Sequence, residues 1–342
     1  MTNAEIIKNL SNWREIAAKY QGAETWKSIW QMCNTILPFL GIWVLMYYSL
    51  NWSYWITLAL AVLNGLFLVR VFIIQHDCGH YAFFNKTKTN DIIGFCCSFL
   101  TSIPYKYWAR THQFHHAHNG QLDTITIGDI RTLSIEQYKA LSKFEQFRYR
   151  MLRNPFVLHI IGPVFYLLVV LRLPLELKAP QWKKFKILQL IHNLLIIGVY
   201  VGLSYLLGWK AFLMIQGPIL VVFITIAFWF FYVQHQHEET YKAWKNQWEY
   251  LLSAIKGSTY YKLPRVFQWF SGNIGFHHIH HLNPRIPNYK LEQCARENKL
   301  LNEYITTVTF FQSLKLIFNK LWDEKNERMI SFQEYYQLEK GA

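Results

Sequence analysis

The stretch Gly275-Phe276-His277-His278-Ile279-His280-His281 carries four histidines in five positions. Two earlier stretches have the same character: His76-Asp77-Cys78-Gly79-His80 and His112-Gln113-Phe114-His115-His116-Ala117-His118. The spacings HxxxH and HxxHH place their rings on one face of a helix. Three such faces that converge would supply eight imidazoles, which is more than a single metal ion takes. The sequence therefore predicts a site for two metal ions.

The apolar residues predict a membrane protein. They make up 52% of the chain, with aromatic residues at 18%, and they are gathered into long runs. Residues 36–50 and 54–74 are predicted to form one transmembrane hairpin, and residues 187–207 and 211–232 a second. The predicted fold is an all-α integral membrane protein with four crossings and a cytosolic helical cap formed by residues 76–186 and 233–342. We expect residues 1–342 to form a single domain.

Two further apolar segments leave the number of crossings open. Residues 91–103 are too short to span a bilayer, and residues 156–173 are interrupted by His159, Gly162 and Pro163. If the second segment spans, the first must span too, which gives an alternative of six crossings. Residues 1–30 are expected to be an amphipathic or loose lead. The aromatic residues of 223–232 are interpreted as membrane packing.

The charged residues predict the orientation. The chain has a formal charge of +14, which predicts an anionic partner. No compact basic and aromatic module typical of nucleic-acid binders is present, so a membrane is favoured over nucleic acid. With four crossings, 33 of the 35 Lys and Arg residues fall on one side. That side is predicted to be cytoplasmic and to hold both termini and every histidine cluster, which places the protein in the cytoplasmic (inner) membrane.

The remaining polar residues near the clusters are assigned different roles. His235 or His237 is expected to add one ligand, and His235 lies closer to the membrane. His118 and His278 break the helical facing of their clusters, so they are interpreted as outer partners of the ligands or as exposed. His159 and His192 are expected to be packed and hydrogen-bonded. Asp77 could accept a hydrogen bond from a neighbouring metal ligand or could simply be solvated, and the two interpretations remain equally open. Glu238 and Glu239 are expected to be solvated.

The type of metal follows from the number of histidines. A closed structural zinc site takes four ligands and usually includes cysteine, but the five cysteines of this chain are not clustered and form no CxxC pair. An all-nitrogen site at the lip of an apolar region suits a redox pair of irons that activates O₂.

The order HxxxH, HxxHH, HxxHH between apolar hairpins resembles the membrane-bound fatty acid desaturases, and most of all the bacterial acyl-lipid desaturases such as the Δ5 type. Specific matches are IIQHDCGHYAFF at 73–84, FYVQH at 231–235 and SGNIGFHHIHHLNPRIPNYKLE at 271–292. Carried over to this sequence, the resemblance implies nine ligands to two iron ions. These are His76, His80, His112, His115, His116, His235, His277, His280 and His281.

The resemblance also implies the reaction. A desaturase of this family uses O₂ and two electrons to introduce a cis double bond into an acyl chain, here in membrane phospholipids. The chain shows no fused electron-transfer domain, so a separate ferredoxin or flavodoxin is the expected donor. Two alternatives stay open: a di-iron hydroxylase or ketolase of alkanes or carotenoids, and a membrane haem or metal-transport protein.

Overall fold

The structure is a computed structural model that describes residues 2–123, 129–173 and 182–341. Four of its helices are long and apolar enough to cross a membrane. They form the two predicted hairpins. The observed bounds are close to the predicted ones, except that the first helix begins at Thr25, eleven residues before the predicted start. The four are α3 (Thr25–Ser49), α4 (Tyr54–Gly79), α10 (Lys183–Leu207) and α11 (Trp209–His235). The prediction of a helical membrane protein is confirmed.

The two shorter apolar segments do not support six crossings. The first forms α5 (Thr87–Thr101), whose 15 residues are too few to span a bilayer. The second forms π-helical turns on both sides of a short α-helix that contains Pro163, which lacks a backbone donor. Together with α8 it makes a pair bent by 59°, so the described residues give four spans, or five if that pair counts as one. These elements are α8 (Lys143–Leu152), η1 (Val157–Ile161), α9 (Gly162–Phe165) and η2 (Tyr166–Val170).

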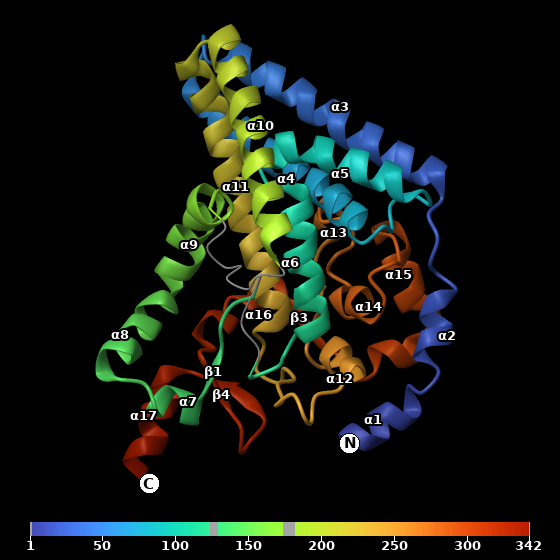
Figure 1. Cartoon of the computed structure of the whole chain (residues 1–342), viewed down its shortest axis with the longest axis vertical. Coiled ribbons are helices and arrows are strands. Elements are labelled where there is room, and N and C mark those ends of the chain that lie inside the picture. The colour runs from blue at the N-terminus through green and yellow to red at the C-terminus, as the bar shows by residue number, and fades with distance from the viewer. Residues whose placement is uncertain (1, 124–128, 174–181, 342) are drawn as a thin grey trace.

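Helix α4 is at the centre of the bundle. It packs against α3, α5 and α11, and its lower half is almost completely buried (Figure 1). Gly65 permits the close approach of α11, because a Cβ atom at this position would lie 2.5 Å from Cγ1 of Val222. By contrast, α10 keeps most of its apolar side chains exposed, as expected of a helix that faces lipid.

The cap lies at the ends of α4 and α11 where the histidine clusters begin (Figure 1). Its first and last helices, α1 and α17, both lie at this end of the molecule (Figure 1). The bounds of the cap helices follow. They are α1 (Asn3–Asn9), α2 (Trp13–Ala18), α6 (Tyr105–His118), α7 (Ile135–Lys139), α12 (Tyr250–Ile255), α13 (Arg265–Phe270), α14 (His277–Leu282), α15 (Asn288–Glu297), η4 (Lys299–Asn302), α16 (Phe310–Ser313), η5 (Leu316–Phe318) and α17 (Phe332–Gly341).

The cap contains five short strands that the sequence analysis did not predict. One sheet has the order β1-β4-β5, in which β1 (Leu133–Ser134) pairs parallel with β4 (Leu321–Asp323), and β5 (Arg328–Ile330) pairs antiparallel with β4. The other sheet pairs β2 (Thr259–Lys262) parallel with β3 (Thr306–Thr309). The pairing of β1 with β4 joins residues that are far apart in the chain, so it ties the segment after α6 to the C-terminal segment, and the pairing of β2 with β3 also joins distant residues. Strands β4 and β5 are close in the chain and form a hairpin.

The N-terminal lead is packed rather than loose. Helices α1 and α2 contact α12 and α14 of the cap. Leu10 of the lead belongs to the same buried cluster as Ile255 and Ile279, and all three side chains are completely buried. The lead therefore covers the helix that carries the third histidine cluster.

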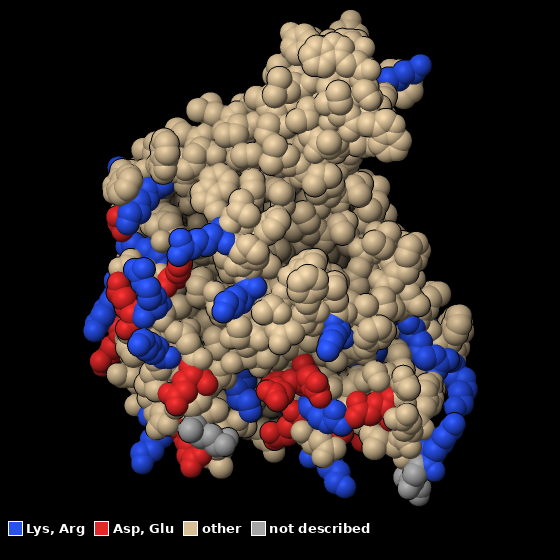
Figure 2. All heavy atoms as spheres, turned by 180° about the vertical axis from the view of Figure 1, so that it is seen from behind, with Lys and Arg blue, Asp and Glu red and all other residues tan. Residues whose placement is uncertain are grey.

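Charged side chains separate the two halves of the molecule. Lys, Arg, Asp and Glu gather over the cap, whereas the half formed by the long helices is almost without charge on the face that Figure 2 shows. This separation matches a protein whose upper half lies in lipid and whose cap lies in water.

Candidate metal centre

Four elements bring the nine predicted ligands together beneath the bundle. The end of α4 carries His76 and His80, and the end of α11 carries His235. The other six lie on α6 and α14, three on each helix. Gly275 lets the chain enter α14 close to β2, because a Cβ atom there would lie 2.5 Å from the carbonyl oxygen of Tyr261. All nine imidazoles are buried, with at most 9% of each residue exposed.

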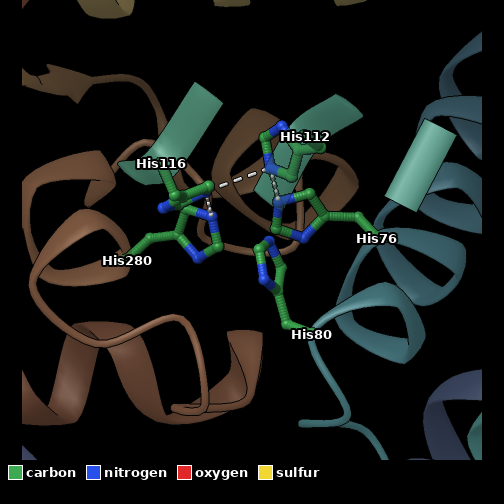
Figure 3. A group of neighbouring side chains, drawn as sticks. All are labelled: His76, His80, His112, His116 and His280. Atoms are coloured by element: carbon green, nitrogen blue, oxygen red, sulfur yellow. Dashed lines mark hydrogen bonds between the residues drawn. The ribbon is translucent and has the colours of Figure 1, made fainter. Parts of the chain in front are cut away.

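The first group contains five rings that point toward one another (Figure 3). One ligand nitrogen from each ring lies within 4.8 Å of those of the other four. The Nε2 atom of His112 lies 3.1 Å from Nε2 of His76 and 3.1 Å from Nε2 of His116, which in turn lies 3.0 Å from Nε2 of His280. The members are His76, His80, His112, His116 and His280.

The second group lies beside the first. The ligand nitrogens of His115, His235 and His281 lie within 4.8 Å of one another. Nε2 of His235 is 3.1 Å from Nε2 of His115 and 3.0 Å from Nε2 of His277. The ring of His277 is also 4.6 Å from that of His281, so His277 completes this group.

The nitrogen contacts fit metal ions better than hydrogen bonds. An imidazole nitrogen has either one lone pair or one proton in the ring plane, so Nε2 of His112 cannot bond to two other ring nitrogens. Two imidazole nitrogens bound to one ion at about 2.1 Å and at right angles lie roughly 3 Å apart, which is the separation found here. His80 and His281 each direct an Nε2 atom that has no hydrogen-bond partner among the described residues. The site is therefore suited to hold metal.

Four of the predicted ligands are in the protonation state that binds metal. Burial holds the pKa of His112 and His116 well below the ordinary histidine value, and neighbouring imidazoles add to the effect. The pKa values of His280 and His281 are lowered in the same way, by burial first. At pH 7 these rings are neutral and each has a lone pair available.

Groups outside the two clusters fix the orientation of the rings. Asp77 Oδ1 lies 3.1 Å from Nδ1 of His76, and Asp77 Oδ2 accepts hydrogen bonds from the backbone N–H and the side-chain amide of Asn288 at 2.7 and 2.9 Å. Nδ1 of His235 donates to the carbonyl of Gly257 at 2.9 Å, which leaves Nε2 with its lone pair. The structure thus decides between the two roles left open for Asp77: it is a buried acceptor.

Replacing Asp77 with asparagine is expected to weaken metal binding by about ten- to a hundredfold. The neutral amide would no longer place a negative charge beside Nδ1 of His76. It also has only one acceptor oxygen for the hydrogen bonds that Asp77 accepts from His76 and Asn288. Iron content after purification and iron loss to a competing chelator measure the effect. Asp123→Asn is the control, since Asp123 is exposed and accepts only from the backbone N–H of Lys245 among the described residues. Equal iron retention in both variants would contradict the role given to Asp77.

Three histidines near the site point elsewhere. His118 Nδ1 donates to the carbonyl of Phe114 at 2.8 Å, and its ring stacks on that of Phe114. His278 and His237 are buried, but their Nε2 atoms contact the side chain of Asn302 at 3.1 Å and the carbonyl of Lys256 at 2.9 Å. Of the two histidines at the end of α11, only His235 reaches the other predicted ligands.

Glu238 and Glu239 are exposed, as expected.

The two histidines within apolar segments are only partly as predicted. His192 stacks on Phe95, and His159 packs between Trp229 and Tyr232. The expected hydrogen bonds are missing, because both ring nitrogens of His159 and Nε2 of His192 have no partner among the described residues.

An apolar cavity of about 650 Å³ reaches both groups of histidines. His76, His112 and His277 line it, and most of the other lining residues belong to α4, α6, α8, α9, α11 and the π-helical turns beside α9. The aromatic residues of 223–232 were interpreted as membrane packing, which is wrong for Phe228, Phe230 and Phe231 because they line this cavity. Aromatic residues that face lipid and those that face a cavity look alike in a sequence, so no local pattern distinguishes them.

Comparisons with known proteins agree with this geometry. The sequence profile of the fatty acid desaturase family matches residues 53–311, a range that contains all nine histidines. The chain belongs to the fatty acid desaturase family. This desaturase is 40% identical over 333 residues to a fatty acid desaturase of Bacillus subtilis (strain 168), an alignment that covers 97% of the chain and 94% of that relative.

Plant desaturases are more distant relatives. The chain is 26% identical over 293 residues to a chloroplastic omega-3 fatty acid desaturase of Glycine max, covering 81% of the chain and 61% of that protein. It is 25% identical over 297 residues to a chloroplastic sn-2 acyl-lipid omega-3 desaturase (ferredoxin) of Helianthus annuus, covering 82% and 64%. The protein is thus an oxidoreductase of the desaturase type and a membrane protein. The hydroxylase, haem and transport alternatives are not favoured.

Proposed function

We propose that this desaturase introduces a cis double bond into acyl chains of membrane phospholipids, using O₂ and two electrons at a di-iron site. The observation that carries the proposal is the apolar cavity whose lining includes His76, His112 and His277. A CH₂ group offers no polar handle, so the protein must select it by the shape of a cavity. The apolar lining binds the chain, excludes water and sets which carbons lie beside the histidines.

The two groups of histidines divide the metal ligands. His76, His80, His112, His116 and His280 would hold one iron ion, and His115, His235, His277 and His281 would hold the other. When bound, the iron pair supplies the activation of O₂ that removal of hydrogen from an inert CH₂ requires. Asp77 and the carbonyl of Gly257 keep the rings of His76 and His235 in the tautomer that presents Nε2.

The remaining proposals concern the surroundings of the enzyme. The basic side of the chain supports an orientation in the cytoplasmic membrane with both termini and the cap in the cytosol. A small acidic ferredoxin or flavodoxin suits this basic cap as electron donor, and the relative from Helianthus annuus is named as a desaturase (ferredoxin). The 342 residues would work as a single domain, since the site draws ligands from four elements between residues 76 and 281.

Expression in a host that lacks desaturases tests the proposed function. We expect new unsaturated acyl chains in the phospholipid fraction, measured by gas chromatography of fatty methyl esters with derivatised double bonds. The same chromatograms detect hydroxylated chains. Oxygenated products in place of unsaturated ones would exclude the proposed reaction.

A further inference from the structure

Two buried cations lie near the cavity without a counter-ion. Arg153 is 2% exposed and Lys320 is 4% exposed. Nε and Nη1 of Arg153 and Nζ of Lys320 have no hydrogen-bond partner among the described residues. Within the same part of the chain, no carboxylate lies within 4.0 Å of either side chain. Buried cations are normally paired, because an uncompensated buried charge is costly.

Fixed contacts hold the two cations in place. Nη2 of Arg153 donates to Oε1 of Gln236 at 2.9 Å and to the carbonyl of Asn319 at 2.8 Å, and Asn319 directly precedes Lys320. The carbonyl of Lys320 accepts from the hydroxyl of Tyr149 at 2.8 Å. The guanidinium is thus anchored by one nitrogen while its other donors remain free.

The surrounding polar atoms add donors and no anion. Nε2 of Gln236 and both ring nitrogens of His159 also lack partners among the described residues. Burial lowers the pKa of Lys320 to about 7, with the charge of Arg153 adding to the effect. An anion between the two cations would favour the charged form of Lys320 and occupy the free donors of Arg153.

The position of Arg153 connects this donor cluster to the substrate cavity. Arg153 lines the same cavity that reaches His76 and His277. Of the two carboxylates on the lining, Glu145 accepts from Ser142 at the start of α8, and Asp129 lies 3.9 Å from His115 Nδ1. Neither carboxylate lies within 4.0 Å of a side-chain nitrogen of Arg153 or Lys320.

Helix α8, which directly precedes Arg153, places this end of the cavity at the membrane surface. It exposes an apolar stripe with helical spacing while Tyr149 is buried on the other side. Basic residues flank the stripe, as in helices that lie in the headgroup region of a bilayer. The exposed apolar residues are Phe144, Phe147, Met151 and Leu152.

We propose that Arg153 and Lys320 bind the phosphate of the substrate phospholipid while its acyl chain lies in the cavity. This inference rests on the proposed function. It identifies the phosphate group as the part of the substrate that the enzyme recognises by charge. Two buried, preoriented cations suit a phosphodiester, which carries a full negative charge and no proton at pH 7. The headgroup would thereby hold the acyl chain at a constant depth relative to the histidines.

Binding to the purified enzyme tests the inference independently of turnover. The probes are dihexanoylphosphatidylglycerol, dihexanoylglycerol and inorganic phosphate, each titrated below micelle formation while the melting temperature is followed. We expect the phospholipid alone to stabilise the wild type. Lys320→Met is expected to weaken phospholipid binding by roughly ten- to a hundredfold, the loss typical of a hydrogen bond between charged groups. Lys325→Met, at an exposed position, is the control.

Further variants and probes separate phosphate binding from a change in protein stability. Lys320→Met removes an unpaired buried charge, so without lipid it is expected to melt no lower than the wild type. Arg153→Lys, which retains the charge but loses the anchored fork, should weaken phospholipid binding less than Arg153→Gln. Equal binding by the wild type and Lys320→Met, or equal stabilisation by dihexanoylglycerol, would overturn the proposal. Equal stabilisation by inorganic phosphate would assign the site to a free anion. Absence of unsaturated products in the expression host would instead refute the proposed function.

Discussion

Replacing His116 or His280 with alanine is expected to abolish the unsaturated product while the protein remains in the membrane. Nε2 of His116 lies between Nε2 of His112 and Nε2 of His280, at 3.1 and 3.0 Å. Loss of either ring would therefore remove a proposed ligand from the first group. Gas chromatography of fatty methyl esters and the iron content of the purified protein measure the effect.

His118→Ala is the matched control for His116→Ala. Both residues lie on α6, but His118 Nδ1 donates to the carbonyl of Phe114 and its ring does not reach the metal ligands. We expect His118→Ala to retain iron and most of its activity. Full activity in His116→Ala or His280→Ala would refute the assignment of that ligand.

Filling the cavity is expected to shorten the acyl chains that the enzyme accepts. Ala227 lines the cavity on α11, eight residues before His235, which corresponds to about 12 Å along a helix. A phenylalanine at position 227 would occupy space on the membrane side of the histidines. We expect Ala227→Phe to reduce product from the longest acyl chains by about tenfold or more, because a chain that cannot enter fully places the wrong carbons beside the site.

The chain-length profile of the products checks this prediction. Ala211→Phe is the control, because Ala211 lies on the same helix near its outer end and is not part of the cavity lining. We expect its profile to match that of the wild type. If Ala227→Phe reduces all chain lengths equally and loses iron, a folding defect rather than a shortened cavity explains the effect.

Local patterns were sufficient for the membrane architecture and for the three histidine clusters, whereas the choice of His235 over His237 came from the family resemblance. Apolar runs of about 20 residues predict crossings whatever they pack against, because the bilayer requires the backbone to be bonded within each helix. The prediction was less accurate where tertiary contacts decide. The lead of residues 1–30 became α1, α2 and the start of α3, since α12 and α14 bury Leu10 and its neighbours. The β1–β4 and β2–β3 pairs of the cap depend on pairing across more than forty residues, which no local pattern shows.

The division of the histidines into two groups also lies beyond local pattern. In each HxxHH cluster the rings four residues apart stay together, namely His112 with His116 and His277 with His281. The third ring of each cluster joins the other group: His115 lies with His235 and His281, and His280 lies with His76 and His116. Spacing predicts that the rings share a helix face, but how they divide depends on where α6 and α14 meet α4 and α11.

By itself, the sequence determined that this protein crosses a membrane, that its histidines lie at one end of the crossings, and that they suit metal. These properties follow from side-chain chemistry, from the length of the apolar runs and from the helical spacing of the histidines. Only the tertiary structure decided which histidines lie together in each group, that Asp77 is buried beside His76, and that a cavity joins the histidines to Arg153. Those properties depend on distances between segments that are remote in the chain, and packing rather than local spacing sets such distances.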